Sequence, residues 1–158
     1  MTKTVCFTGH RSIPGKDYAR LYDLLQQTVE QLIRDGASIF RTGGALGFDT
    51  MAALCILNLR RQYPHIRLEL ILPCPTQTEQ WQESDVLLYE QIMERADIYR
   101  YVSQSYYTGV LQMRNRSLVE GADVCVAYLR TSNGGGAAYT AAYALKQGLE
   151  LINLQDLL

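Results

Sequence analysis

Short apolar runs and longer amphipathic segments alternate along the whole chain. The runs are rich in β-branched and aromatic residues and end at glycine, proline or polar positions, which is typical of buried strands. The longer segments repeat apolar residues every three or four positions, which predicts helices. The expected strands are residues 4–8, 38–42, 68–72, 98–102, 124–129 and 149–154. The expected helices are residues 17–35, 49–61, 84–96, 110–120 and 137–147.

The order of these elements predicts the fold class. Strands that are apolar throughout, such as residues 124–129, are typically buried on both faces. Strands that alternate with helices are joined by right-handed crossovers and pair mostly in parallel. We therefore expect one α/β domain over residues 1–158, with a Rossmann-like three-layer fold and a mostly parallel sheet. Residues 74–84 are polar, hold the only tryptophan, and are expected to form a long loop beside the sheet.

The composition narrows the range of partners. A net charge of −1 over 158 residues creates no strong field of one sign, so binding of nucleic acid through bulk charge is not expected. No apolar run reaches the roughly 18 residues of a membrane span, and the apolar run near the first residue is too short for a signal peptide. The sequence thus predicts a cytoplasmic protein that has no membrane partner.

The four cysteines indicate neither a disulfide framework nor a zinc site. Cys6 and Cys125 lie in expected strands, and no two cysteines form a CxxC pair. A free cysteine in an apolar run behaves as a small hydrophobic residue. We expect neither a bound metal nor a resident cofactor.

Three loops that follow expected strands carry glycine or polar residues. They are residues 8–11, 43–49 and 132–140. The carboxyl ends of parallel strands meet at one edge of the sheet, where α/β proteins bind their ligands. The second and third loops run directly into helices, whose first N–H groups lack intrahelical partners and attract anions. We therefore predict a phosphate site formed by loops that are far apart in sequence.

Each candidate residue also has a simpler interpretation. A Gly-Gly pair after a strand is often only a turn, and neither loop matches GxGxxG or the P-loop pattern. Asp49 is either a ligand contact or the N-cap of the next helix. His10 and Arg11 either donate to a phosphate or ribose or are ordinary surface residues. Arg114 either binds an anion with its planar fork or forms a structural ion pair.

A cluster of tyrosines is the next notable feature of the sequence. The chain has 11 tyrosines, and four of them cluster between residues 99 and 107. We expect this cluster to pack against the edges of the core or to form an oligomer interface, and we expect a homo-oligomer. The clustered residues are Tyr99, Tyr101, Tyr106 and Tyr107.

The motifs together resemble a known superfamily. Their order and spacing are similar to those of the SLOG superfamily, named for the Smf/DprA and LOG proteins, and within it to the YpsA-like group. The resemblance covers nearly the whole chain. The matching motifs are TGHR at 8–11, TGGALGFD at 42–49, Gln80-Trp81, Arg114-Asn115, GADVCVAY at 121–128 and GGGAAYTAAYAL at 134–145.

The resemblance implies a Rossmann-like fold in which Gly-rich loops form a pocket for a nucleotide derivative. Combined with the loop argument, it defines the set of candidate ligand-binding residues. They are Thr8, Gly9, His10, Arg11, Gly43, Gly44, Ala45, Gly47, Asp49, Arg114, Asn115, Asn133, Gly134, Gly135, Gly136 and Thr140.

LOG enzymes suggest one alternative, since they resemble hydrolases that release a base from a nucleoside monophosphate. They use an Arg and a Glu near a PGGxGTxxE signature. Arg114 stands at the Arg position, but the Glu position falls on Ala141, and residues 139–145 contain no carboxylate. Because N-glycosidic cleavage needs a positioned acid or base, this absence counts against the activity. The residues that would have to replace the Glu are Asp49, Glu79 or His10.

The other members suggest binding functions. DprA-like members bind single-stranded DNA and a recombinase, but the mild acidity of this chain disfavours that role. Other SLOG domains are linked to the sensing of nucleotide signals related to ADP-ribose or NAD, which requires no catalytic carboxylate. We therefore expect a sensor or binding protein for a phosphate-bearing, nucleotide-like ligand. Glycine amides of the two loops would bind the phosphate, Arg11 and Arg114 would neutralise it, and catalysis is left open.

Overall fold

Six strands and five α-helices alternate within residues 2–130 and 135–158, which this computed structural model describes. The strands are β1 (Lys3–Gly9), β2 (Ala37–Thr42), β3 (Arg67–Leu72), β4 (Ile98–Tyr101), β5 (Val124–Tyr128) and β6 (Glu150–Asn153). The helices are α1 (Gly15–Arg34), α2 (Phe48–Leu59), α3 (Glu83–Arg95), α4 (Val110–Val119) and α5 (Gly136–Lys146), with a final 3₁₀ helix η1 (Leu154–Leu157). Every predicted strand and helix is confirmed, with ends that differ by up to two residues.

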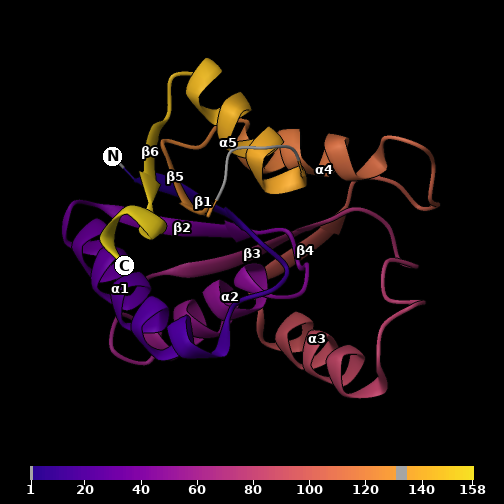
Figure 1. Cartoon of the computed structure of the whole chain (residues 1–158), viewed down its shortest axis with the longest axis horizontal. Coiled ribbons are helices and arrows are strands. Elements are labelled where there is room, and N and C mark those ends of the chain that lie inside the picture. The colour runs from indigo at the N-terminus through magenta and orange to yellow at the C-terminus, as the bar shows by residue number, and fades with distance from the viewer. Residues whose placement is uncertain (1, 131–134) are drawn as a thin grey trace.

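The strands form one sheet in the order β4-β3-β2-β1-β5-β6, and every neighbouring pair is parallel. The chain starts in the middle at β1, proceeds outward to β4, and then crosses back to β5 and β6 (Figure 1). The Rossmann-like α/β fold is thus confirmed, and its sheet is entirely rather than mostly parallel. The loops after β1 and β5 diverge, which is the arrangement that opens a ligand crevice in such sheets.

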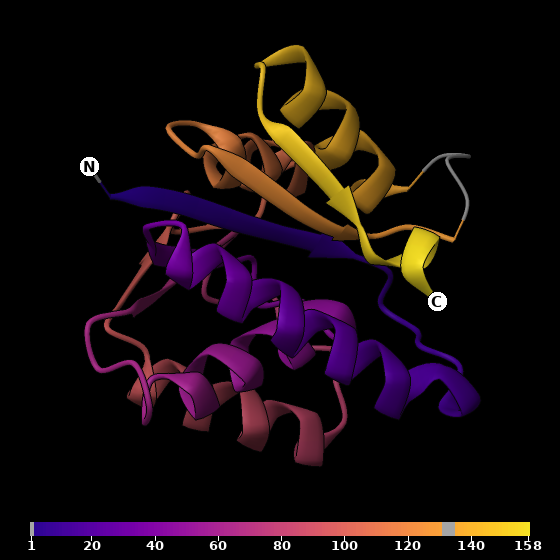
Figure 2. The same cartoon turned by 90° about the vertical axis from the view of Figure 1, so that its left-hand side faces the viewer.

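Helices cover both faces of the sheet. Figures 1 and 2 show α1, α2 and α3 on one face and α4 and α5 on the other. The apolar side chains of β1 alternate between the two layers: Val5 and Phe7 pack with the first three helices, and Cys6 packs with α4 and α5. This alternation explains why the central strands are apolar at every position.

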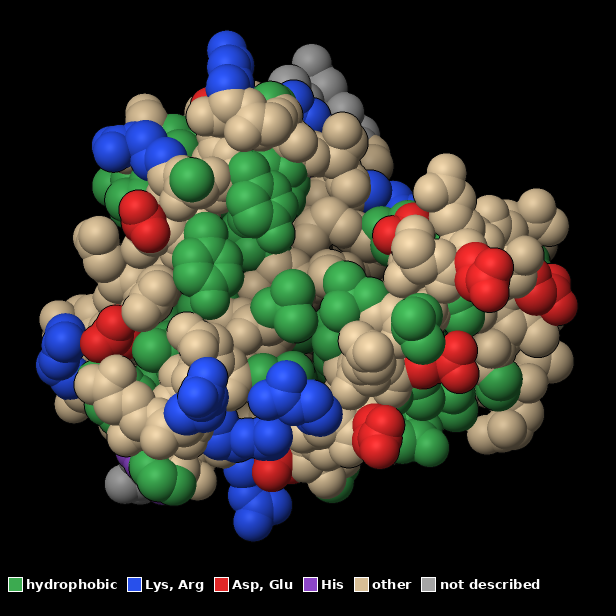
Figure 3. Space-filling view, turned by 90° about the horizontal axis from the view of Figure 1, so that it is seen from below, with side chains coloured by type: hydrophobic (Ala, Val, Ile, Leu, Met, Phe, Trp, Pro, Cys, Tyr) green, Lys and Arg blue, Asp and Glu red, His purple; other side chains and the backbone are tan. Residues whose placement is uncertain are grey.

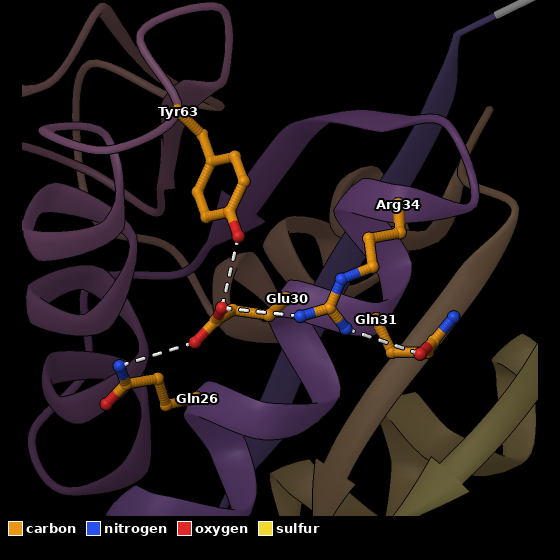
Figure 4. A network of polar contacts seen from close by, with 5 residues as sticks. All are labelled: Gln26, Glu30, Gln31, Arg34 and Tyr63. Carbon is orange, nitrogen blue, oxygen red and sulfur yellow. Dashed lines mark hydrogen bonds and ion pairs between the residues drawn. The ribbon is translucent and has the colours of Figure 1, made fainter.

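Helix α1 packs through one apolar stripe and carries a polar network at its outer end. The buried stripe consists of Leu21, Leu25, Val29, Leu32 and Ile33. The hydroxyl of Tyr63 donates to Glu30 at 3.1 Å, and Arg34 forms an ion pair with the same carboxylate at 3.7 Å (Figure 4). The network fixes the segment after α2 against α1. Because Arg34 is largely exposed, the ion pair adds little stability.

The tyrosine cluster follows the core-edge expectation at one position only: Tyr101 is partly buried and packs against the core. Tyr99, Tyr106 and Tyr107 are 50%, 66% and 43% exposed, so packing against the core edges is wrong for these three residues. An oligomer interface stays a prediction.

Two further features bear on the expectations for cysteines and membranes. All four cysteines are free thiols in buried positions. Among the helices that the structure describes, none combines the length and the apolar character needed to cross a bilayer.

Candidate functional site

A large cavity lies at the carboxyl edge of the sheet, where loops from distant parts of the chain meet. Its volume is about 970 Å³. The loop after β1, the loop after β2, the first turn of α5 and one side of α4 all line it. The predicted site residues in this larger cavity are Thr8, Gly9, His10, Arg11, Ala45, Asp49, Arg114, Asn115, Gly135 and Gly136.

A second hollow of about 340 Å³ adjoins the larger cavity on the face covered by α1, α2 and α3. Figure 3 shows a hollow near the upper edge of this face, with acidic side chains gathered over α3 at its right. The predicted residues Gly44 and Gly47 line only this smaller hollow. Arg11, Asp49 and Trp81 line both, so the two spaces meet beside them.

Asp49 is held by the loop that precedes it. The N-cap of α2 is Gly47, so the interpretation of Asp49 as the N-cap is wrong: it is the second residue of the helix. Its carboxylate accepts a hydrogen bond from the Ala45 N–H at 3.2 Å. Burial raises the pKa of Asp49 to about 6, against the opposing effects of Arg114 and of the Ala45 and Gly43 amides. Amides that we expected to bind phosphate thus serve an internal carboxylate.

Arg114 crosses the base of the larger cavity and is 7% exposed. Its Nη1 donates to the Gly43 carbonyl, and its Nε donates to Asn115 Oδ1 at 2.8 Å. The ion pairs among described residues lie elsewhere, so the interpretation of Arg114 as half of a direct structural ion pair is wrong. Burial lowers the pKa of Arg114, while the charge of Asp49 raises it. Within the described chain Nη2 has no hydrogen-bond partner, so it can still bind an anion.

His10 connects the two diverging loops. Its Nε2 accepts a hydrogen bond from the Arg130 N–H at 2.8 Å, and its ring meets the edge of Tyr128 at 5.6 Å. Because Nε2 accepts this hydrogen bond, it carries no proton and the ring is neutral; burial and the nearby Arg130 charge lower the pKa of His10 in the same sense. In this state His10 holds the start of the β5–α5 loop and brings no positive charge to a phosphate. The neighbouring Arg11 is exposed and lines both spaces.

The first turn of α5 is the open helix end of the site. Its N-cap is Gly135, Gly136 is its first residue, and no side chain of the described residues caps it. Asn133 and Gly134 lie outside the described residues. Thr140 does not line either space, because its buried hydroxyl donates to the Gly136 carbonyl at 2.8 Å.

Gly43 also lies outside the lining of both spaces and has a packing role. A Cβ there would lie 2.8 Å from Arg114 Nη1 and 3.0 Å from Asp49 Oδ2. The position therefore requires glycine so that the arginine and the carboxylate can approach the same stretch of backbone.

The sequence argument missed several residues that line the spaces. Trp81 lies between them and packs edge-on against Tyr89, with ring centroids 5.4 Å apart. The signal was a single tryptophan in a polar loop. Tyr106 and Asp85 also line the larger cavity, and their sequence surroundings did not distinguish them from surface residues. Glu79, considered in the sequence only as a replacement for the LOG glutamate, lines the larger cavity too.

Gly47 is the most constrained glycine of the site. Its φ is +81°, and an added Cβ would collide with the Arg11 backbone. We expect Gly47→Ala to destabilise the fold by about 3 kcal/mol, the upper end for a strained backbone position. Gly109→Ala is the matched control, since Gly109 has a φ of +99° at another N-cap but open space around it. Urea unfolding should give Gly47→Ala a clearly lower free energy of unfolding than Gly109→Ala. Equal losses of stability in the two variants would contradict the steric argument.

The next features concern metal binding and catalytic carboxylates at the site. Among residues 2–130 and 135–158, no three His, Cys, Asp or Glu side chains gather closely enough to hold a metal ion. The position that matches the LOG glutamate is Ala141, which is 4% exposed within α5. Carboxylates at the larger cavity come instead from Asp49, Glu79 and Asp85.

The amino-acid sequence of this chain matches a known protein family and individual relatives. The model of the YspA SLOG family matches residues 6–155. UPF0398 protein BH1768 of Halalkalibacterium halodurans is 31% identical over 124 residues, which cover 77% of this chain and 66% of that protein. A UPF0398 protein of Bacillus pumilus is 31% identical over 117 residues, which cover 73% of this chain and 63% of that protein. The chain thus spans about two thirds of the length of these relatives.

Solved structures share the fold. DNA processing protein A from Helicobacter pylori, a structure that describes a single-stranded DNA binding mode, has a TM-score of 0.65 and 20% identity. The likeness covers 94% of this chain and 63% of that one. The structural-genomics target TM1055 has a TM-score of 0.58 and 20% identity, with 94% of this chain and 72% of that chain covered. At these identities the likeness concerns the fold alone.

Proposed function

Because this chain belongs to the YspA SLOG family, as the motifs in the sequence indicated, we propose that its larger cavity binds a phosphate-bearing, nucleotide-like ligand. The observation that carries the proposal is the convergence of Arg11, Arg114 and the glycine-rich start of α5 on one cavity. A volume of about 970 Å³ falls within the range of small-molecule sites. The role is that of a sensor or binding protein.

The phosphate subsite lies at the start of α5 rather than in the loop after β2. Asp49 already accepts a hydrogen bond from the Ala45 amide, and its negative charge repels a second anion from that loop. The first N–H groups of α5 have no side-chain cap among residues 2–130 and 135–158, and they carry the positive end of the helix dipole. Arg114 Nη2 and the exposed Arg11 supply positive charge from the same cavity.

The nucleotide-like part of the proposal rests on the remaining lining. Trp81 and Tyr106 offer aromatic surface, and Glu79 and Asp85 offer carboxylates that accept hydrogen bonds from sugar hydroxyls. A ligand with a phosphate at one end and a nucleoside at the other matches this distribution. ADP-ribose and NAD, which the family resemblance suggests, share that chemistry.

Gly136→Ala tests the phosphate subsite without breaking the fold. An added Cβ would lie 3.5 Å from Asn115 Nδ2, an ordinary contact, so the variant should fold normally. The new methyl group would stand where the anion approaches the α5 amides. We expect the dissociation constants of AMP and ADP-ribose, measured by calorimetry, to rise at least tenfold, and Arg11→Met to weaken both by a factor of about 10–100.

Gly15→Ala is the matched control for this experiment. Gly15 is the first residue of α1, and a Cβ there has no neighbour within 4 Å. Its affinity for both nucleotides should equal that of the original protein. The proposal fails if no nucleotide binds, or if Gly136→Ala binds as tightly as Gly15→Ala.

Single-stranded DNA is a second candidate ligand. It is favoured by the DNA-binding neighbour of the same fold and by the exposed Tyr106 at the cavity, because aromatic side chains stack on bases. Glu79 and Asp85 in the same lining oppose a polyanion. A labelled oligonucleotide should show a salt-sensitive shift if this role is real, and binding of mononucleotides alone would exclude it.

A further inference from the structure

The smaller hollow contains a buried hydroxyl without a partner. Thr42 ends β2, is fully buried, and lines the hollow. Its Oγ1 has no hydrogen-bond partner among the described residues. Buried polar groups are nearly always paired, so an orphaned hydroxyl at the wall of a cavity points to a missing partner. Thr42 faces the same side of the sheet as Phe40, which packs against the first three helices, and it pairs in register with Leu70.

Apolar and aromatic side chains form a large part of the remaining wall of the hollow, beside a few charged residues. Leu46 and Ala53 come from the loop and helix after β2, Leu88 comes from α3, and Tyr89 and Trp81 add ring surface. Roughly 150 Å³ of apolar cavity is enough to hold a benzene ring. The volume of about 340 Å³ therefore accommodates a bicyclic ring system.

The charges around the hollow oppose an anionic occupant. Its carboxylates are Asp49 and Asp85, and Arg11, its one cationic residue among those that the structure describes, is exposed and shared with the larger cavity. An uncharged planar ring with a hydrogen-bonding nitrogen or oxygen satisfies Thr42 and fits the apolar walls.

We propose that the smaller hollow binds the uncharged purine base of the nucleotide whose phosphate lies at the start of α5. This assignment rests on the proposed function and adds the location and class of the base. The two spaces meet at Arg11, Asp49 and Trp81, so one ligand can extend from the α5 amides into the hollow. The base lies on the α1–α3 face of the sheet, and the phosphate lies at the α4–α5 side.

Separate probes for the two halves of the ligand test the assignment. Adenosine and guanosine carry the base without phosphate, and ribose 5-phosphate carries phosphate without a base. Trp81 is the only tryptophan and lines the hollow, so its fluorescence reports a purine that enters. We expect at least one of the two nucleosides to change the Trp81 emission in a saturable titration, and ribose 5-phosphate to bind by calorimetry.

Two variants locate the base. Thr42→Val removes the orphaned hydroxyl at constant shape, so the ligand-free variant should be at least as stable as the original protein. It should weaken nucleoside binding about tenfold. Ala53→Leu fills the hollow from α2 and should weaken nucleoside binding at least tenfold. Thermal unfolding checks that this variant is folded. Ribose 5-phosphate should bind both variants as it binds the original protein.

The outcomes separate the two proposals. The base assignment is overturned if Thr42→Val and Ala53→Leu bind nucleosides as tightly as the original protein, or if no nucleoside binds. The phosphate proposal survives either result when ribose 5-phosphate binds in a Gly136-dependent manner. Conversely, nucleoside binding that depends on Thr42, without any binding of ribose 5-phosphate, supports the base assignment and removes the phosphate subsite.

Discussion

Arg114→Leu is expected to lower the free energy of unfolding by about 3–5 kcal/mol, because it leaves two acceptors without their donor, at roughly 1–3 kcal/mol each, and removes the main charge that opposes the burial of Asp49. Arg114 donates to the Gly43 carbonyl and to Asn115, and its charge opposes the burial of Asp49. Without the guanidinium, those acceptors lose their donors and the buried carboxylate loses the larger of the two positive charges that act on it, leaving only the weaker effect of Arg11. Urea unfolding at pH 7 measures the loss.

The matched control is Arg116→Leu on the same helix. Arg116 is exposed and contacts Tyr139 and Tyr143 at the surface, so its replacement should have a small effect. Similar losses for the two variants would show that Arg114 has no special structural role. The double variant Arg114→Leu/Asp49→Asn should recover part of the stability, because it also removes the uncompensated carboxylate.

Asp49→Asn is expected to change the pH dependence of stability by roughly 2.4 kcal/mol between pH 4 and pH 7, out of about 3 kcal/mol over the whole titration. Burial raises the pKa of Asp49 from 3.8 to about 6 in the folded protein. A raised pKa means that the folded state binds the proton more tightly, so the contribution is fully present below pH 3.8 and is lost as the pH rises through 6. Each pKa unit corresponds to 1.36 kcal/mol, which gives the magnitude.

The comparison between the two proteins isolates this group. All other titrating side chains are common to both, so the stability of the original protein minus that of Asp49→Asn should decrease as the pH rises from 4 to 7. Urea unfolding at intervals across this range gives the curve. A constant difference, or one that increases with pH, would show that Asp49 is not a buried carboxyl group with a raised pKa.

The fold was predictable because its signals are local. Apolar runs such as residues 124–129 are buried strands, and the stripe that begins at Leu21 is the buried face of α1. Continuous apolar strands require helices on both faces, which leaves few arrangements other than a parallel α/β sheet. The exposure of Tyr99 was not predictable, because it depends on β4 being the strand at the edge of the sheet.

The site was predictable only in part. Glycine-rich loops after strands identified the edge of the sheet where Arg11, Gly135 and Gly136 line one cavity. The role of Asp49 could not be predicted from the sequence. Its carboxylate accepts a hydrogen bond from the Ala45 amide, and this contact depends on the three-dimensional geometry of the loop. Thr140 illustrates the reverse case, since a hydroxyl in a candidate loop turned out to bond within its own helix.

The sequence by itself determined the α/β class, the order of the elements and the three loops at the carboxyl edge, because strand and helix periodicity and glycine position are properties of neighbouring residues. Only the tertiary structure decided which groups are already paired. It showed that the amide of Ala45 serves Asp49, that Arg114 Nη2 and Thr42 Oγ1 have no described partner, and that Trp81 stands between two spaces. These facts depend on contacts between segments that are far apart in the chain, which local patterns do not encode.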